Sequence, residues 1–343
     1  MKPSHSDSMN GCKNTVNYRN LILIMRLLMM GTGPFAVPTF HALLNSQHTV
    51  TGLVTRPPVS SRSRKAIHNP MLEAAQETGL PVAMPEDINS PTGHEAITGF
   101  TPDVLVVCDY GQILSTETLG LSPLGGINLH GSLLPRYRGA APVNWAIMQG
   151  DPVTGITVIH MTPRLDGGPI LTSCQTEIEE NEDAQQLEQR LSELGVEPVL
   201  EALRQLEDWD GTSAIGVSQA AAEVTQARRL RKDDGRLDWT LSASELHNRI
   251  RGLKPWPGTY THWLRSEDSP MRLIIVKATP AGENPSDGAQ PGEVVPSDPG
   301  QILVATGSGT LSLEVIQPAG RKAMPVDAFL RGYSISPGER FGD

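Results

Sequence analysis

The chain has 343 residues, of which 38% are hydrophobic and 19% charged, and its formal net charge is -10. This composition is typical of a folded globular protein and excludes a disordered or fibrous chain, while the length predicts two domains. The charge is uneven, because residues 1–226 carry 13 Lys and Arg against 24 Asp and Glu, whereas residues 227–343 carry 15 against 14. The acidity of the first part therefore says little about the surface of the second.

The cysteines and histidines predict neither disulfides nor a metal site. Cys12, Cys108 and Cys174 form no C-x-x-C pair, and the nine histidines show no H-E-x-x-H spacing. This cysteine usage favours a reducing, cytoplasmic location. The apolar run 21–30 is interrupted by Arg26 and has no small-residue cleavage site, so we interpret it as neither a signal peptide nor a membrane span.

After a polar stretch that we expect to be a flexible extension (1–24), strand and helix patterns alternate along the chain. "RLLMMGTGPFAVPTFHALLNSQHTVTGLVT" has the order strand, glycine turn, helix, strand, which opens a βαβ unit. "DVLVVCDYG" (103–111) is a nearly unbroken apolar run that suits a buried parallel strand, and residues 184–207 have the periodicity of one long amphipathic helix. We predict that residues 25–209 form a doubly wound α/β domain with a mostly parallel, Rossmann-like sheet.

The pattern changes after residue 209. Residues 210–227 show no sustained period and are predicted to be a linker. In residues 228–343 a short helix around "SASELHNRIRGL" precedes five short strand patterns separated by Gly, Pro, Ser and Asp, which predicts a small OB-like β-barrel. The strand patterns are "GTYTHWL", "RLIIVKATP", "GEVVP", "QILVATG" and "TLSLEVIQP".

The glycine turn "GTGPFA" fits the pattern G-x-G-x-x-A with Gly31, Gly33 and Ala36. A dinucleotide site would also need an acidic residue at the end of the second strand, where this chain has Thr55 and Arg56. Two interpretations stay open: Arg56 receives the 2′-phosphate of NADP, or the motif is only a tight strand-to-helix turn. We favour the turn, because the motif alone is a weak signal.

The loop "TRPPVSSRSRK" (55–65) is strongly basic. It carries Arg56, Arg62, Arg64 and Lys65 and no acidic residue. Such a loop is either a solvated surface segment or an arm that contacts nucleic-acid phosphates, for which Arg and Lys provide sequence-independent affinity.

The stretch "NLHGSLLPRYRGAAPVNWA" (128–146) places two polar side chains where a strand ends. Asn128 and His130 are two residues apart, so an extended strand directs both to the same side, at the sheet edge where open α/β folds bind ligands. Asp166 follows in the glycine-flanked loop "RLDGGPIL". Asp can orient a His that moves a proton, and Asn can donate to a developing oxyanion. Because no Ser or Cys nucleophile completes this set, it suits transfer of an acyl group to a nucleophile that the substrate brings.

The segments "INLHGSLLPRYRGAAPVNWAIMQGDPVTGITVIHM" and "LDGGPIL" resemble the folate-dependent formyltransferases. "RLDWTLSASELHNRIRGLKPWPGTY" and "LSLEVIQPAGRKAMPVDAFLRG" resemble the branch of this family that acts on methionyl-tRNA. The resemblance implies transfer of the formyl group of 10-formyltetrahydrofolate to the free amino group of methionyl-initiator-tRNA in translation initiation, without a metal. We also expect no membrane partner and a monomer.

The resemblance also implies roles for individual residues. The catalytic set falls on Asn128, His130 and Asp166. The tetrahydrofolate-binding loop falls on Ser132, Leu133, Leu134 and Pro135. Contacts with tRNA fall on Arg56, Arg62, Arg64 and Lys65 and, in the C-terminal domain, on Arg228, Arg229, Arg231 and Lys232. The serines of loop 55–65 depart from the family pattern, which leaves open whether Arg62 or Arg64 makes the main contact. Formyl transfer to a small amine, an NADP-dependent oxidoreductase and a non-catalytic RNA-binding module are the alternatives.

Overall fold

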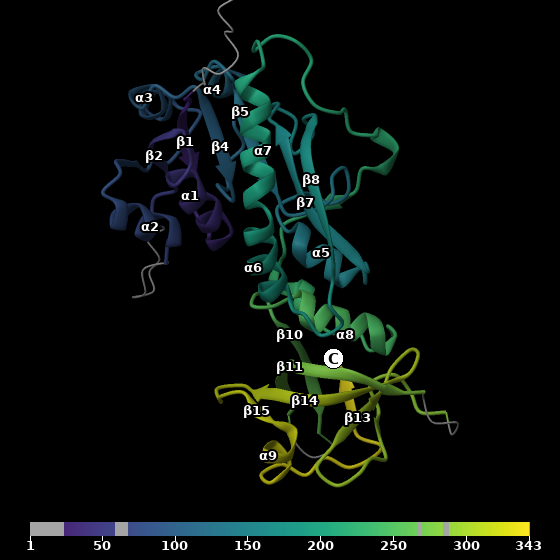
Figure 1. Cartoon of the computed structure of the whole chain (residues 1–343). Helices are drawn as coiled ribbons and strands as arrows, with labels where there is room; N and C mark the ends of the chain where they lie inside the picture. Colours follow the sequence, from purple (N-terminus) through teal and green to yellow (C-terminus); the bar gives the residue numbers. More distant parts are fainter. Residues whose placement is uncertain (1–23, 59–67, 266–268, 284–287, 343) are drawn as a thin grey trace, which may run out of the picture.

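The computed structural model describes residues 24–58, 68–265, 269–283 and 288–342 (Figure 1). Two large β-sheets with separate hydrophobic cores lie at opposite ends of the molecule, and helix α8 (Ala243–Gly252) lies between them. The extension expected over residues 1–24 falls almost entirely outside the described residues.

The first sheet has seven strands. Their spatial order is β3 (Val82–Ala83), β2 (Thr49–Val54), β1 (Arg26–Met30), β4 (Val104–Cys108), β5 (Gly126–His130), β7 (Val153–His160) and β8 (Ile170–Glu177). The pairs from β3 to β5 are parallel, and β5–β7 and β7–β8 are antiparallel. The predicted mostly parallel, Rossmann-like sheet is therefore confirmed.

Helices cover both faces of this sheet because its central strands are apolar on both sides. In β1, Leu27 and Met29 belong to one core, and Leu28 and Met30 belong to the other, as the alternation of side chains along a strand requires. The first core includes side chains from α1 (Val37–Leu44), α2 (Pro70–Thr78), α5 (Pro142–Met148), α6 (Ala184–Leu194) and α7 (Val196–Glu207). The second includes side chains from α3 (Pro91–Gly99) and α4 (Thr116–Leu119). This is a doubly wound arrangement.

The prediction of one helix over residues 184–207 is wrong. Two helices follow each other, with Gly195 between α6 and α7. Pro198 explains the interruption, because it has no N–H to donate to the carbonyl of Leu194 and its ring would clash with that carbonyl inside a helix. As the third residue of α7, Pro198 lies in the first turn, where a missing N–H is tolerated.

The second sheet is a nearly closed antiparallel barrel. Its strand order is β12 (Val294–Val295), β13 (Ile302–Ala305), β14 (Thr310–Pro318), β11 (Met271–Gly282), β10 (Thr259–Leu264) and β16 (Arg340–Gly342), and β15 (Met324–Pro325) pairs with β14. A bridge between Glu293 and Arg340 joins the two ends of this order. The five predicted strands are present and the OB-like barrel is confirmed. The sequence patterns missed β15 and the closing strand β16, and α9 (Val326–Leu330) packs against the barrel core.

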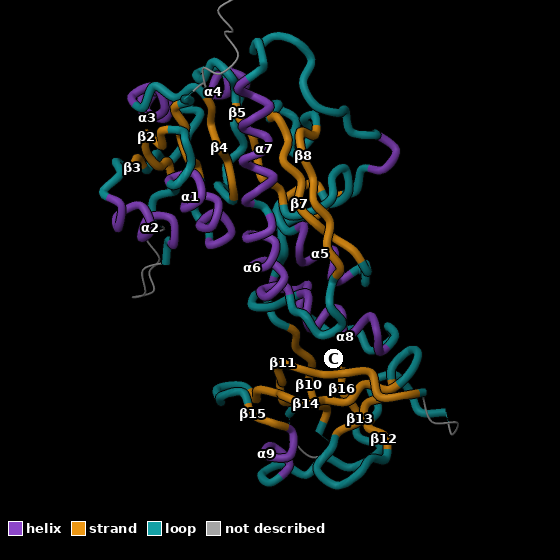
Figure 2. Tube along the Cα trace, viewed as in Figure 1, coloured by secondary structure: helices purple, strands orange, loops and turns teal. Residues whose placement is uncertain are grey.

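The segment predicted as a linker, 210–227, lies against the first domain (Figure 2). Val217 forms an antiparallel bridge with Ile170 of β8, and β9 (Gln226–Ala227) pairs with β6 (Arg138–Gly139). This segment includes the 3-10 turn Ala221–Glu223, and a second such turn, Lys232–Gly235, follows β9. The chain therefore runs alongside the loop between β5 and α5 before it enters the second domain.

Helix α8 packs directly on α5 of the first domain. The Nδ2 of Asn144 donates to the carbonyl of Gly252 at 2.8 Å, and a Cβ at Gly252 would lie 2.7 Å from Cγ of Met148. The buried guanidinium of Arg251 donates to the carbonyl of Glu182 at 3.0 Å. The close approach of the two helices thus requires a residue without a side chain at position 252, and a buried cation fixes the orientation of α8.

Candidate active site

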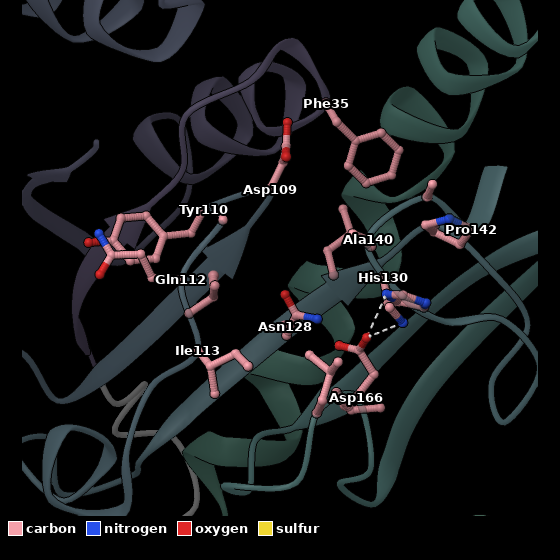
Figure 3. Close-up of a pocket in the computed structure, with 18 of the residues that line it drawn as sticks. Phe35, Asp109, Tyr110, Gln112, Ile113, Asn128, His130, Ala140, Pro142 and Asp166 are labelled. Carbon is pink, nitrogen blue, oxygen red and sulfur yellow. Dashed lines mark hydrogen bonds and ion pairs between the residues drawn. The ribbon is translucent and has the colours of Figure 1, made fainter. Parts of the chain in front are cut away.

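The three predicted catalytic side chains meet at one cavity. Asn128 and His130 lie on the same side of β5, whose last residue is His130, and Asp166 reaches them from the loop between β7 and β8 (Figure 3). All three line a cavity of about 500 Å³, a volume within the range of small-molecule sites. The prediction from residue spacing that Asn128 and His130 share one side of the strand is confirmed.

His130 lies between two acceptors. Its Nε2 is 2.9 Å from the carbonyl oxygen of Tyr137, and its Nδ1 is 3.7 Å from Oδ2 of Asp166. Because a carbonyl can only accept, Nε2 carries the proton in that hydrogen bond. The separation from Asp166 exceeds a hydrogen bond, but the carboxylate lies beside the ring.

Asp166 is held in an unusual backbone conformation. Its φ is +47°, in the left-handed region, and its Oδ2 accepts a hydrogen bond from the N–H of Gly139 at 2.8 Å. The same oxygen therefore faces both Gly139 and His130. A non-glycine residue with positive φ persists only where surrounding contacts fix it, and such residues cluster at functional sites.

The loop after His130 is fixed by its own hydrogen bonds. The hydroxyl of Ser132 donates to the carbonyl of Arg136 at 2.7 Å, and the N–H of Leu134 donates to Oγ1 of Thr157 at 3.0 Å. This loop brings the carbonyl of Tyr137 to His130. Among the described residues that line the cavity, none belongs to Ser132–Pro135, so direct contact of these four residues with folate stays a prediction.

One wall of the cavity is apolar and uncovered. Ile113 and Leu165 are exposed at 58% and 47%, unusually open for large aliphatic side chains, and Leu114 and Met161 line the same cavity. Gln112 adds an amide beside them. An apolar wall with a few polar groups suits a flat heterocyclic ligand, because such a ligand would cover these side chains on binding.

Two further carboxyl groups line the cavity, Asp109 at the end of β4 and Glu188 on α6. Burial first, and then the nearby charge of Glu188, raise the pKa of Asp109 to about 7, while the N–H of Gly33 acts in the opposite direction. Burial also raises the pKa of Glu188. The Asp109 side chain is exposed at the cavity, so water there screens its charge and weakens the shift of its pKa. The sequence patterns missed both residues, yet the rule that singled out His130, a polar residue at a strand end, also fits Asp109.

The glycine turn forms a tight strand-to-helix connection. At the end of β1, the N–H of Gly31 donates a hydrogen bond to the carbonyl of Val54. The 3-10 turn Pro34–Ala36 then leads into α1. The turn lies against the carboxylate of Asp109. A dinucleotide phosphate bound at this turn would face that side chain, which is unfavourable when it is ionised.

The structure places only some of the residues that we predict to contact tRNA. Arg62, Arg64 and Lys65 lie outside the described residues. Arg56 is half-buried, with its Cδ 3.4 Å from the position that a Cβ on Gly111 would take. Gly111 itself lines the cavity, so Arg56 stands next to the cavity wall.

In the C-terminal group, Arg229 lines the catalytic cavity, whereas Arg228, Arg231 and Lys232 do not. Arg228 is exposed, forms an ion pair with Asp234 and lies over the ring of Trp145, 5.1 Å from its centroid. Arg231 and Lys232 are exposed. The segment from Arg228 to Lys232 is thus a basic strip that begins at the cavity.

Within the described ranges, no cluster of three or more His, Cys, Asp or Glu side chains could hold a metal ion. None of the helices in the same ranges combines the length and the apolar composition that a bilayer-spanning helix requires.

The sequence matches the family "Formyl transferase" over residues 25–203 and "Formyl transferase, C-terminal domain" over residues 229–334. It is 41% identical over 325 residues to a methionyl-tRNA formyltransferase of Rhodopirellula baltica, covering 92% of this chain and 96% of that protein. A second methionyl-tRNA formyltransferase, from Geobacter sulfurreducens, is 37% identical over 320 residues, with coverage of 93% and 97%.

Solved structures share the fold at low sequence identity. An N-formyltransferase from Helicobacter canadensis, in complex with folinic acid and dTDP-3-aminofucose, matches with a TM-score of 0.60 and 14% identity over 85% of this chain and 98% of that one. HypX from Aquifex aeolicus, in complex with tetrahydrofolic acid, matches with a TM-score of 0.59 and 16% identity over 92% of this chain and 50% of that one.

Proposed function

The chain belongs to the formyltransferase family, and we propose that it formylates methionyl-initiator-tRNA with 10-formyltetrahydrofolate as the donor. The observation that carries this proposal is the convergence of Asn128, His130 and Asp166 on one cavity. The proposal is also supported by the relatives named methionyl-tRNA formyltransferase, which this chain matches over nearly their whole length. The product is N-formylmethionyl-tRNA, the substrate of translation initiation. We further propose that the protein acts as a cytoplasmic monomer.

The reaction requires the free amine of the methionyl ester to attack the formyl carbon of the donor. The new bond joins the methionyl nitrogen to that carbon, and the bond between the carbon and N10 of the folate breaks. A tetrahedral oxyanion forms between these steps. One proton leaves the attacking nitrogen and one is delivered to N10, so the reaction needs no redox partner.

The cavity residues suit these steps. The amide of Asn128 donates to the oxyanion, and His130 stabilises it and moves the proton from the attacking amine towards N10. Asp166 stabilises the positive charge that His130 acquires. The apolar wall around Ile113 and Leu165 takes the folate heterocycle, which places the formyl group near Asn128.

We assign the contacts with the acceptor tRNA to two groups of basic residues. Arg56, Arg62, Arg64 and Lys65 form one group, and Arg228, Arg229, Arg231 and Lys232 form the other. Of the members that the structure describes, Arg229 lines the cavity and Arg56 lies next to its wall, so each group has one arginine close to the place that the methionyl ester must reach.

The direct test is formyl transfer by the purified protein from 10-formyltetrahydrofolate to methionyl-initiator-tRNA, beside methionyl-elongator-tRNA and a small amine such as a nucleotide-linked amino sugar. We expect rapid formylation of the initiator tRNA and slow or no formylation of the other two acceptors. Formylation of the small amine without formylation of tRNA would overturn the acceptor assignment, and the absence of formylated product with every acceptor would overturn formyl transfer.

A further inference from the structure

Gln219 lies in the aperiodic segment 210–227, and its side chain reaches the loop that carries Asp166. The Nε2 of Gln219 donates to the carbonyl of Asp166 and to the carbonyl of Gly168, both at 2.8 Å. Its Oε1 accepts from Nε of Arg138 at 3.0 Å and from a second nitrogen of the same guanidinium.

These contacts use the full hydrogen-bonding capacity of the amide, which has two donors and an oxygen with two lone pairs. They also fix its orientation, because the two carbonyls need donors and the guanidinium needs an acceptor. Gln219 therefore connects the loop of Asp166 to Arg138, which is only 4% exposed. Few substitutions of Gln219 would preserve all four contacts.

The backbone around Gln219 is itself anchored. The N–H of Val217 donates to the carbonyl of Ile170 at 2.8 Å, and the N–H of Ile170 returns a bond of the same length. Gly216 has a φ of +69°, and a Cβ there would lie 2.5 Å from the carbonyl oxygen of Ile170. The chain thus holds Gln219 in place from the start of β8, close to the loop that it contacts.

The backbone of Asp166 needs such support. Its positive φ is unfavourable for an aspartate, and its carboxylate must point at once to Gly139 and to His130. Gly139 holds the side chain and Gln219 holds the carbonyl. Without the second contact, the peptide group after Asp166 would keep only the hydrogen bond from the N–H of Gly167 to the carbonyl of Arg164 at 3.0 Å, and the carboxylate would be held less firmly beside the ring of His130.

We propose that Gln219 is a positioning residue for Asp166, so that the segment between the domains contributes to the active site. This inference depends on the proposed function for the role of Asp166. It assigns to Gln219 an action through Asp166 and no contact with either substrate.

The test is the substitution Gln219→Glu. A glutamate keeps an acceptor for Arg138 and adds an ion pair, so the variant should fold, but it cannot donate to the two carbonyls and places a negative charge against them. Gln219→Ala removes all four contacts and provides a second variant. The matched control is Gln205→Glu on α7, because Gln205 also donates to a backbone carbonyl, that of Leu171 at 3.3 Å, away from the catalytic loop.

We expect Gln219→Glu to lower kcat about ten- to a hundredfold, as displacement of a catalytic group does, while KM for both substrates stays within about twofold. Gln205→Glu should leave both constants near those of the wild type. Wild-type kcat in Gln219→Glu, or an equal loss in the control, would overturn the proposal. So would a loss confined to KM, because it would indicate substrate contact.

A second readout does not depend on activity. Hydrogen exchange of the backbone amides in residues 164–168 should be faster in both Gln219 variants than in the wild type or in Gln205→Glu, because the loop loses its anchor. Unchanged exchange would overturn the positioning role even if kcat fell. If the wild type formylates no acceptor but the exchange difference is found, the proposed function fails and the anchoring of the loop by Gln219 stands.

Discussion

The carboxylate of Asp109 lies directly against the backbone of Gly33. An ideal Cβ built on Gly33 would stand 1.8 Å from Oδ2 of Asp109, far inside van der Waals contact. Asp109 reaches this position with a φ of +47°, in the left-handed region that is uncommon for residues other than glycine. The glycine turn after β1 therefore accommodates a carboxyl group of the protein itself at the edge of the catalytic cavity.

Asp109→Asn should make the protein more stable at pH 8 but not at pH 4. Burial and Glu188 raise the pKa of Asp109 from 3.8 to about 7. At a pH between these two pKa values, the folded state therefore holds a proton that the unfolded state has lost. The free energy of unfolding of the wild type therefore falls as the pH rises from about 4 to about 7. An asparagine resembles the protonated carboxyl group and removes this dependence.

We expect the gain at pH 8 to be about 1 kcal/mol, less than the full pKa shift implies, because water in the cavity screens the Asp109 side chain. Urea unfolding at pH 4 and pH 8 measures it. The control is Asp208→Asn, an exposed carboxylate at the C-terminal end of α7. A gain of equal size at both pH values would show that the substitution acts through packing and not through charge.

Gly33→Ala should destabilise the protein through contact with Asp109. The new methyl group collides with a carboxylate at the end of a short side chain, which must move, and we expect a cost of about 1–3 kcal/mol, typical of overpacking. A double-mutant cycle with Asp109→Ala isolates this contact, because the alanine at 109 removes the colliding atoms. If the cost of Gly33→Ala is the same in both backgrounds, the glycine is required by the turn alone.

Residue patterns predict the strands and the two-sided core well, because both follow from local periodicity. The apolar run of residues 103–111 contains β4, and the spacing of Asn128 and His130 is sufficient to place them together at the end of β5. The interruption between α6 and α7 also has a local cause, Pro198, which amphipathic periodicity alone does not take into account.

The supporting contacts of the site could not be predicted in this way. Tyr137 and Gly139 act through backbone atoms, which leave no trace in side-chain chemistry. Glu188 lies in an acidic stretch that also suits a solvated helix face, and Gln219 lies in a segment without periodicity. Their positions depend on how distant segments pack, and residue types alone do not encode this.

Asn128→Ala and His130→Ala should each lower kcat at least about a hundredfold, because removal of one oxyanion donor costs about 3 kcal/mol of transition-state stabilisation. Single-turnover formylation measures the chemical step, and filter binding measures the affinity for tRNA. We expect that affinity to stay near that of the wild type, since both side chains lie inside the cavity. An equal loss of tRNA binding would show that the two residues support the fold instead of the reaction.

The affinity for tRNA should fall steeply with salt, because Lys and Arg that contact phosphates release bound counterions. Lys232→Ala should reduce the slope of log K against log salt by about 1, the value for one phosphate contact. Arg228→Ala should reduce it less, because the ion pair with Asp234 already neutralises part of the charge that Arg228 would offer to a phosphate. Arg204→Ala is the control, since Arg204 lies on α7 and is paired with two glutamates of its own helix. A slope near zero for the wild type, or equal effects of Lys232→Ala and Arg204→Ala, would contradict a tRNA contact by the strip from Arg228 to Lys232.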